Sequence, residues 1–341
     1  MLKTFLRSAA ALVILVAMNM LLDLTVIPPL WGAGDEWLKL EELRRHPERF
    51  NALVIGNSRA AREIMPAQLD GISDQGVPLQ FMNVGIPAMT GPEELYVLQT
   101  VLRSGIRPRL VLLQIIPVRG PGPSTRGSAR SRYYLTLQTM MHTLRGIRTA
   151  PIENRYDVMR VFLLEYTKKV LHFNVLNEVL LSLNQMVDNP TALGPKGDGF
   201  FALDWYQEGT KIFNDHREYL AAHPTGLQSI RSTVKASESP DCRKFATKAT
   251  IALLNSMRRT AEQAGATAIF FQEVPNASPQ IECIRRALNE ESALAPLSTG
   301  DFPKLYDPEM YFDDRHLNAK GAALYSGILR KQLTDLLGDQ H

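Results

Sequence analysis

The sequence has little cysteine: only Cys242 and Cys283 occur in 341 residues. Their spacing matches no zinc-binding pattern, and no other cysteine is present to complete a four-ligand zinc site. Two cysteines fit either one disulfide in an exported domain or two unrelated buried thiols. Cys242 begins a helical segment that leads into a predicted strand over residues 266–274, and Cys283 follows that strand. Both positions fall near one edge of a parallel sheet, so we expect a disulfide.

The sequence also lacks an excess of either charge and any internal repeat. Lysine and arginine total 38, aspartate and glutamate total 35, and the net charge is +3. No block of basic residues interleaved with aromatic residues occurs, so the sequence does not indicate nucleic-acid binding. The absence of a repeat argues against a solenoid. A hydrophobic content of 45% with 21% charged residues indicates a globular protein and excludes a mainly disordered chain.

A long apolar segment near the N-terminus follows two basic residues, Lys3 and Arg7. Residues 8–31 are mostly apolar and are long enough to cross a bilayer if Asp23 lies near the interface. No clear cleavage site follows the apolar core. We therefore interpret residues 1–31 as an uncleaved signal anchor, a cytoplasmic basic region followed by a transmembrane helix, with the rest exported and held at the inner membrane. A cleaved signal peptide and a buried helix of a cytosolic protein are the alternatives.

Beyond the anchor, the apolar pattern predicts a connector and one α/β domain. Residues 32–50 are polar and helix-prone, and we interpret them as a connector helix. Residues 51–341 form the predicted domain, in which helical patterns alternate with apolar runs typical of strands buried on both faces. These runs are 52–56, 79–84, 109–116 and 266–274. The alternation predicts a parallel sheet flanked by helices.

An insertion of about residues 120–240 interrupts this alternation between the third and fourth strands. Its first part is largely helical, and residues 189–233 return to loops and short elements. Residues 158–187 are unusually apolar. We favour packing of this segment over the core as a lid, because apolar helical stripes usually face a core. The alternative is that it lies on a membrane or on a membrane partner.

Ser58 is the first residue that suggests chemistry, because it follows the predicted strand 52–56 in a Gly56-Asn57-Ser58 turn. The turn would place its hydroxyl at the carboxyl edge of the sheet, where open α/β sheets bind ligands. A serine at the start of a helix is also a common N-cap, because its oxygen accepts a hydrogen bond from a helix N–H group. Position alone leaves both interpretations open.

The second suggestive pattern is Asp313-Asp314-Arg315-His316 near the C-terminus. A carboxylate three residues before a histidine can share one turn with it and bind its Nδ1, which leaves Nε2 to face a serine. A hydroxyl, an imidazole and a carboxylate are the three parts of an activated serine nucleophile. Asp313 or Asp314 would serve equally well as a helix N-cap or a solvated charge.

Three blocks in this order resemble the SGNH hydrolases, also called the GDSL-like superfamily. The blocks are Gly56-Asn57-Ser58, Asn83-Val84-Gly85 and Asp313-Asp314-Arg315-His316. The resemblance covers the predicted core outside the insertion and implies an SGNH-like, flavodoxin-like α/β fold. It implies Ser58 as the nucleophile, His316 as the base and Asp313 as the residue that orients His316. It also implies the N–H groups of Ser58 and Gly85 as oxyanion donors.

The sequence departs from that family's pattern at two places. Asn57 stands where the family has aspartate, at a position outside the triad. The family's third block carries an asparagine just after the third strand, whereas this chain reads Gln114 to Arg119 there without one. Loss of one oxyanion donor typically raises a reaction barrier by about 3–4 kcal/mol. Arg119 and Gln114 are the candidate replacements.

The anchor, the Gly-Asn-Ser-Arg turn and the Asp-Asp-x-His-Leu-Asn sequence resemble membrane-anchored extracytoplasmic members of this superfamily. Such proteins modify cell-envelope polymers and exopolysaccharides with acyl groups, commonly beside a membrane-bound O-acyltransferase. The resemblance implies a periplasmic serine esterase or O-acyltransferase acting on an acylated glycan or lipid-linked substrate, with no metal or organic cofactor. A plain carbohydrate esterase or lipase, and a non-catalytic scaffold of an envelope polysaccharide assembly, are the alternatives.

Overall fold

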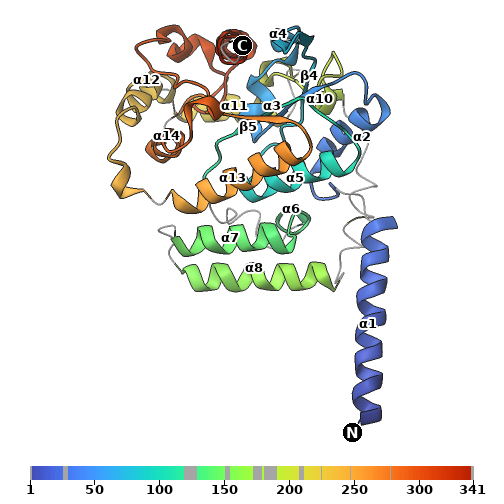
Figure 1. The fold of residues 1–341 in the computed structure, drawn as a ribbon. Coiled ribbons are helices and arrows are strands. Elements are labelled where there is room, and N and C mark those ends of the chain that lie inside the picture. Colours follow the sequence, from blue (N-terminus) through green and yellow to red (C-terminus); the bar gives the residue numbers. More distant parts are fainter. Residues whose placement is uncertain are drawn as a thin grey trace.

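The centre of the molecule is a parallel four-stranded sheet with the strand order β4-β1-β5-β6. The strands are β1 (Ala52–Ile55), β4 (Phe81–Asn83), β5 (Leu110–Gln114) and β6 (Thr267–Phe271). Each lies within one of the predicted apolar runs. This confirms the predicted α/β class, a parallel sheet between helices, as Figure 1 shows. The computed structural model describes residues 2–25, 30–118, 129–149, 154–171, 179, 190–206, 211–223, 225–245, 247–276 and 278–338.

Helices cover both faces of the sheet. One face carries α5 (Gly91–Arg103) and α13 (Lys248–Gln263), and the other carries α3 (Ser58–Glu63), α4 (Pro66–Leu69) and α15 (Ala319–Gly338). The smaller elements are β2 (Ser73–Asp74), β3 (Val77–Pro78), η3 (Leu203–Trp205), η5 (Glu290–Ser292), η6 (Pro303–Tyr306) and η7 (Pro308–Met310).

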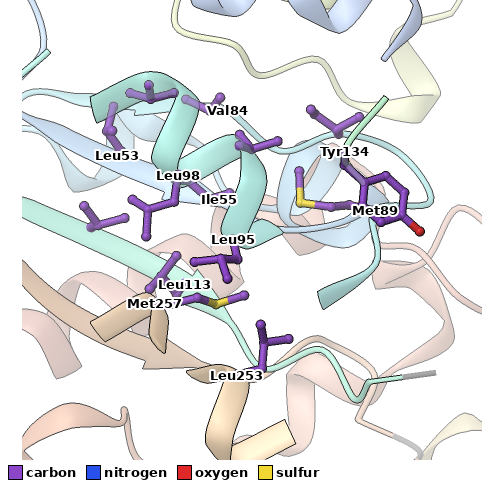
Figure 2. Close-up of a cluster of buried hydrophobic side chains, with 14 of the residues drawn as sticks. Leu53, Ile55, Val84, Met89, Leu95, Leu98, Leu113, Tyr134, Leu253 and Met257 are labelled. Carbon is purple, nitrogen blue, oxygen red and sulfur yellow. The ribbon is translucent and has the colours of Figure 1, made fainter. Parts of the chain in front are cut away.

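The apolar core is divided into two layers because successive residues of a strand point to opposite faces of a sheet. Leu53 and Ile55 of β1 face the layer of α5 and α13, whereas Ala52 and Val54 face the layer of α15. Figure 2 shows the first layer, in which side chains from both helices meet the sheet: Leu95, Leu98, Leu253 and Met257. Both faces of β1 are therefore buried, which explains its uninterrupted apolar sequence.

The insertion adds helices outside this core: α6 (Ala129–Arg132), α7 (Leu137–Thr149), α8 (Arg155–Val170), α10 (Pro190–Leu193), α11 (Lys211–Ala222) and α12 (Gly226–Ser237). Helix α7 packs against α5 and α13, and α8 packs on the outer side of α7 (Figure 1). The prediction of loops and short elements over residues 189–233 is wrong for α11 and α12. Helix α12 fully buries only Ile230, Val234 and Ser237, so it has few core-facing residues to mark it in the sequence.

The predicted lid over residues 158–187 is described only in part. Residues 172–178 and 180–189 lie outside the described residues. Helix α8 buries Val158, Phe162 and Glu165, and its other large apolar side chains include exposed ones. The described part of this segment therefore packs one side against the core, as the lid prediction expects, and leaves other apolar side chains exposed.

The N-terminal segment contains α1 (Leu2–Thr25), a helix that projects from the rest of the molecule in Figure 1. Within the described residues, no helix is both long enough and apolar enough to cross a membrane. Residues 26–29 of the predicted anchor lie outside the described residues. The predicted connector contains η1 (Gly34–Glu36) and α2 (Trp37–Arg45).

A disulfide joins Cys242 to Cys283, and the two Cα atoms are 5.4 Å apart. Cys242 begins the short helix η4 (Cys242–Lys244) at the end of the insertion. Cys283 lies in α14 (Pro279–Arg286), which follows β6. The bridge therefore ties the end of the insertion to the segment that follows the last strand of the sheet.

Replacement of both cysteines with serine should lower the free energy of unfolding by about 4 kcal/mol in the chain-entropy model, because the bridge joins residues 41 positions apart. Urea unfolding of the wild type and the double variant measures this difference. Wild-type protein kept reduced with dithiothreitol is the control, and it should unfold at the same urea concentration as the variant. An unchanged free energy of unfolding in the double variant would contradict this account.

Candidate active site

Ser58 is the first residue of α3, and the local sequence explains its position. Gly56 passes so close to β5 that an added Cβ would lie 2.4 Å from Gln114 Oε1. Asn57 is the N-cap of α3, because its Oδ1 accepts a hydrogen bond from the N–H of Arg59 at 2.9 Å. The N-cap interpretation of Ser58 is therefore wrong, and its hydroxyl is left for another partner at the carboxyl edge of the sheet.

The structure brings the three predicted triad residues together, although 258 positions separate Ser58 from His316. Ser58 Oγ lies 2.9 Å from His316 Nε2. His316 Nδ1 lies 3.1 and 3.0 Å from Oδ1 and Oδ2 of Asp313. Asp313, and not Asp314, is thus the carboxylate that contacts the imidazole, and this contact leaves Nε2 facing the serine.

The loop around Asp313 favours its ionised form. Burial alone would raise the pKa of Asp313, but the hydrogen bond and charge of the His316 side chain, with two backbone N–H groups, lower it overall. The N–H groups of Arg315 and His316 each donate to Asp313 Oδ1 at 2.7 Å. The His316 side chain is 20% exposed and that of Asp313 is 22% exposed. The pair is therefore partly shielded but in contact with solvent.

Helix α3 also holds the loop that carries His316. Arg59 Nε donates to the carbonyl oxygen of Arg315 at 3.0 Å, and Glu63 Oε1 accepts from the N–H of Leu317 at 3.2 Å. These contacts fix the backbone immediately before and after His316. Both side chains come from the helix that begins with Ser58, so one short helix sets the distance between the hydroxyl and the imidazole.

Further polar contacts connect this helix to the sheet. Gln114, the last residue of β5, accepts from the N–H of Asn57 at 2.8 Å and donates from Nε2 to Glu273 at 3.0 Å. Glu273 follows β6 and forms an ion pair with Arg59. Burial alone would lower the pKa of Arg59, but Glu273 and Glu63 raise it overall. The serine turn, two strands and the histidine loop therefore share one hydrogen-bonded network.

The peptide groups of Gly85 are used within the chain. Its N–H donates to Asn83 Oδ1 at 2.9 Å, and its carbonyl oxygen accepts from buried Lys39 Nζ at 2.7 Å. A Cβ at this position would lie 2.6 Å from the backbone nitrogen of Ala61 in α3. Gly85 is therefore explained by close packing, and its contacts do not support the predicted role as an oxyanion donor.

The other predicted oxyanion donors differ in availability. Gln114 is engaged with Asn57 and Glu273, and Arg119 lies outside the described residues. The N–H of Ser58 makes no hydrogen bond to any residue that the structure describes, so it is available. A separate feature of this region is the backbone of Ala88, in the loop after β4. Its φ of 58° is a strained conformation for alanine. Alanine rarely adopts it, so the sequence gives no indication of it.

The insertion contributes further side chains to the histidine loop. The ring of His216 in α11 stacks on Phe312 with their centroids 3.6 Å apart. Burial lowers the pKa of His216, against the opposing charge of Asp313. Tyr219 of the same helix is hydrogen-bonded to Asp314, which raises the Tyr219 pKa. Sequence reasoning missed both residues, because they belong to a helix that it did not predict.

A cavity of about 270 Å³ lies beside this loop. Ile230 and Val234 of α12 give it apolar lining, and Arg59, Asp314 and Arg315 give it charged lining. Arg59, Asp314 and Arg315 are sequence neighbours of the triad residues, but Ser58, Asp313 and His316 do not themselves line the cavity. The insertion therefore forms part of the wall of a cavity beside the histidine loop.

A second serine–histidine contact shows why the carboxylate matters. Ser256 Oγ lies 3.3 Å from His142 Nε2, where α13 meets α7. Both side chains are buried. Burial and the charges of Arg145 and Arg259 lower the His142 pKa. His142 Nδ1 contacts no carboxylate among the residues described, so this pair lacks both the orienting group and the solvent access of the first.

A comparison with protein-family models, curated proteins and solved structures finds no match to this chain. Across the described ranges, no three His, Cys, Asp or Glu side chains are grouped so as to hold a metal ion. The geometry itself defines a hydrogen-bonded series of hydroxyl, imidazole and carboxylate groups at the carboxyl edge of a parallel sheet. Such a series of groups can activate a serine as a nucleophile.

The buried carboxyl group of Glu63 should give a measurable pH dependence. Burial raises its pKa well above the usual range, and Arg59 and the N–H of Leu317 oppose this only in part. A raised folded-state pKa stabilises the fold below the unfolded-state pKa, and this stabilisation is lost as the pH rises through the folded-state pKa. Glu63→Gln keeps a side-chain oxygen that can accept the hydrogen bond from the N–H of Leu317, and it removes the ionisable carboxyl group. Between about pH 5 and pH 9, the free energy of unfolding of the variant relative to wild type should therefore rise with pH, because only the wild type has to ionise a buried carboxyl group.

Urea unfolding at several pH values measures this trend. Glu262→Gln in α13 is the matched control, because Glu262 is exposed, and its stability difference from wild type should not change with pH. If the difference between Glu63→Gln and wild type stays constant across this range, Glu63 does not have a raised pKa.

Proposed function

We propose that this protein is an SGNH-type serine esterase or acyltransferase that uses Ser58, His316 and Asp313. The observation that carries this proposal is the continuous hydrogen-bond chain from Ser58 Oγ through the imidazole to the Asp313 carboxylate. In the first half-reaction, His316 Nε2 takes the Ser58 proton while Oγ attacks the carbonyl carbon of an acyl ester. The leaving alcohol then receives this proton, and the acyl group stays on Ser58.

In the second half-reaction, His316 takes a proton from water or from an acceptor hydroxyl, whose oxygen attacks the acyl group on Ser58. Collapse of this intermediate returns the proton to Ser58 Oγ and releases either an acid or a new ester. Asp313 stabilises the imidazolium in both halves, and its lowered pKa keeps it ionised for this role. The Ser58 N–H is a donor to the oxyanion, and Arg119 stays our candidate for a further donor.

For the substrate, we propose an acylated glycan or lipid-linked glycan of the cell envelope. Sugars combine apolar faces with hydroxyl groups, and the cavity combines Ile230 and Val234 with Asp314 and Arg315. The insertion places α11 and α12 beside the histidine loop, and exclusion of water by a bound acceptor would favour transfer because water then competes less with that acceptor. An acceptor sugar in this cavity is therefore the arrangement that we favour over plain ester hydrolysis.

We also propose an extracytoplasmic location, with residues 1–31 holding the domain at the inner membrane. The basic residues Lys3 and Arg7 precede the apolar segment, as in proteins whose following domain is exported. The disulfide supports the same location, because disulfides persist in oxidising compartments. A membrane-bound O-acyltransferase is the partner that we propose as the source of acyl groups.

A non-catalytic scaffold of a polysaccharide assembly is the second candidate, and the oxyanion region favours it. The N–H of Gly85 is hydrogen-bonded to Asn83, and no asparagine follows β5. Each missing donor costs about 3–4 kcal/mol of transition-state stabilisation. A protein that keeps the fold without the reaction would tolerate these losses.

Ser58→Ala should abolish labelling by a fluorophosphonate probe and reduce ester cleavage by at least about 10³-fold, because the nucleophile is lost. Labelling of the purified full-length protein and hydrolysis of a chromogenic acetyl ester measure the two effects. Ser232→Ala is the matched control, since the Ser232 hydroxyl lies on the exposed side of α12 and only contacts its own helix.

The outcomes of this experiment separate the candidates. Full acyl-polymer formation in cells by a folded Ser58→Ala protein would reject the enzyme and favour the scaffold. A labelled Ser58 in a protein that cleaves esters, but never transfers an acyl group to an added glycan, would favour the plain esterase.

A reporter fusion after His341 tests the location independently. Alkaline phosphatase fused there should be active in cells, because this enzyme needs disulfides that form outside the cytoplasm. The same fusion with Lys3 and Arg7 replaced by glutamate is the control and should lose activity, since these residues specify the orientation. An inactive phosphatase beside an active cytoplasmic reporter at the same position would reject the proposed export.

A further inference from the structure

Exposed apolar side chains are concentrated on a few helices of the described structure. Of fourteen exposed large hydrophobic residues, five lie on α1 and seven lie on α7, on α8 or at the C-cap of α8. Only Val77 and Trp205 lie elsewhere. Soluble proteins usually scatter such residues singly over their surface, so their concentration on two neighbouring helices indicates an interaction surface.

The inner side of α8 fixes which residues face outward. Val158 and Phe162 are buried, and Glu165, which is 3% exposed, pairs with Arg132 at 2.8 Å and with Lys168 at 2.8 Å. A buried ion pair is costly to break because it leaves an uncompensated charge. Helix α8 is therefore held in this orientation and does not rotate to bury its opposite side.

The outer side of α8 forms an apolar stripe, because residues three, four and seven positions apart share one face of a helix. Its exposed apolar residues are Tyr156 (80% exposed), Leu163 (45%), Leu164 (53%), Val170 (46%) and Leu171 (52%). On the neighbouring helix α7, Leu137 and Met141 are exposed one turn apart. We call these seven residues the α7–α8 apolar face.

Basic residues accompany this face. The exposed charged residues of α7 and α8 are Arg145, Arg148, Arg155, Arg160 and Asp157. Four positive charges against one negative charge complement an anionic surface. Apolar side chains accompanied by arginine are typical of helices that lie in a membrane interface, where the apolar groups enter the lipid and the basic groups meet phosphates.

Helix α1 extends on the same side of the molecule. In Figure 1 it runs past α8 and away from the sheet, whereas α15 and the C-terminal end lie on the opposite side. Its exposed residues include Leu6, Val13, Ile14, Met18 and Leu21. Two separate apolar surfaces therefore lie on one side of the protein.

We infer that the α7–α8 apolar face lies in the interface of an anionic phospholipid bilayer, parallel to its plane. Leu163 and Leu164 would enter the boundary between headgroups and acyl chains, and Arg145 and Arg160 would meet lipid phosphates. This inference rests on the proposed membrane location, and it is independent of the chemistry at Ser58. Lipid is the occupant that matches both the exposed apolar residues and the excess positive charge, because exposed Arg160 lies among these residues on the outer side of α8.

A nitroxide label at Leu163→Cys in the full-length protein tests this inference. Both native cysteines are in the disulfide, so only the introduced cysteine is labelled in the absence of a reductant. Collisions of the label with oxygen and with a water-soluble nickel chelate are measured with and without vesicles of phosphatidylethanolamine and phosphatidylglycerol. Vesicles should raise the accessibility to oxygen and lower that to nickel, because oxygen concentrates in lipid and the chelate is excluded.

A label at Lys331→Cys is the matched control, because this exposed residue lies on α15 at the opposite side of the molecule. Its accessibilities should not change when vesicles are added. A label at Leu164→Cys, on the same stripe, should repeat the result at Leu163→Cys and guards against a local effect of one substitution. Vesicles without phosphatidylglycerol should reduce the change at both sites, since the arginines would lose their anionic partners.

Three results would overturn the inference. Protein that stays off the vesicles, or unchanged accessibilities at Leu163→Cys in vesicle-bound protein, would show that lipid does not contact this face. A fall in both accessibilities would show that protein, such as a second copy of this chain, covers it. Fluorophosphonate labelling of Ser58 in the same samples keeps the proposals apart, because the reaction is judged by that labelling alone.

Discussion

The two hydrogen bonds on either side of His316 are the contacts on which the candidate site depends. Arg59 and Glu63 reach the backbone of Arg315 and Leu317 from the helix that begins with Ser58. They directly connect the helix that carries the serine, near the start of the domain, to the loop that carries the histidine, near its end. Burial of a carboxyl group and a guanidinium is costly, and Glu273 beside Arg59 offsets part of that cost. The Arg59–Glu273 ion pair therefore stabilises the guanidinium that bonds the histidine loop, in addition to linking α3 to the segment after β6.

The polar network lies at one end of an otherwise apolar sheet. The strands are buried on both faces and consist mainly of aliphatic and aromatic residues, whereas polar groups gather where the strands end. Gln114 ends β5, Glu273 follows β6, and buried Glu94 of α5 accepts from the N–H of Gln114 at 2.8 Å. Burial raises the pKa of Glu94 well above its usual range. The apolar core thus holds the strands in place, and the carboxyl edge of the sheet provides the hydrogen-bonding groups of the site.

The features of the fold and of the candidate site that could be predicted are those marked by a pattern of neighbouring residues in the sequence. Continuous apolar runs mark the four strands, and the Asp-x-x-His spacing places Asp313 beside His316 because both belong to one tight loop. The contact of Glu63 with Leu317 has no such pattern, since its partners are 254 positions apart. Gly85 shows a different limit: the sequence marks a required glycine, but only the packing against α3 tells why it is required.

The histidine loop lies close to the C-terminus, and α15 holds it there. Asn318 Oδ1 accepts from the N–H of Gly321 at 2.9 Å, and Gly321 lacks a side chain where a Cβ would lie 2.2 Å from the carbonyl oxygen of Met310. Helix α15 in turn contacts α3 and α4. During synthesis, Ser58 is therefore translated early, whereas His316 is translated only near the end of the chain. Chains that end before residue 316 consequently carry the Ser58 hydroxyl without the imidazole that contacts it in the complete fold.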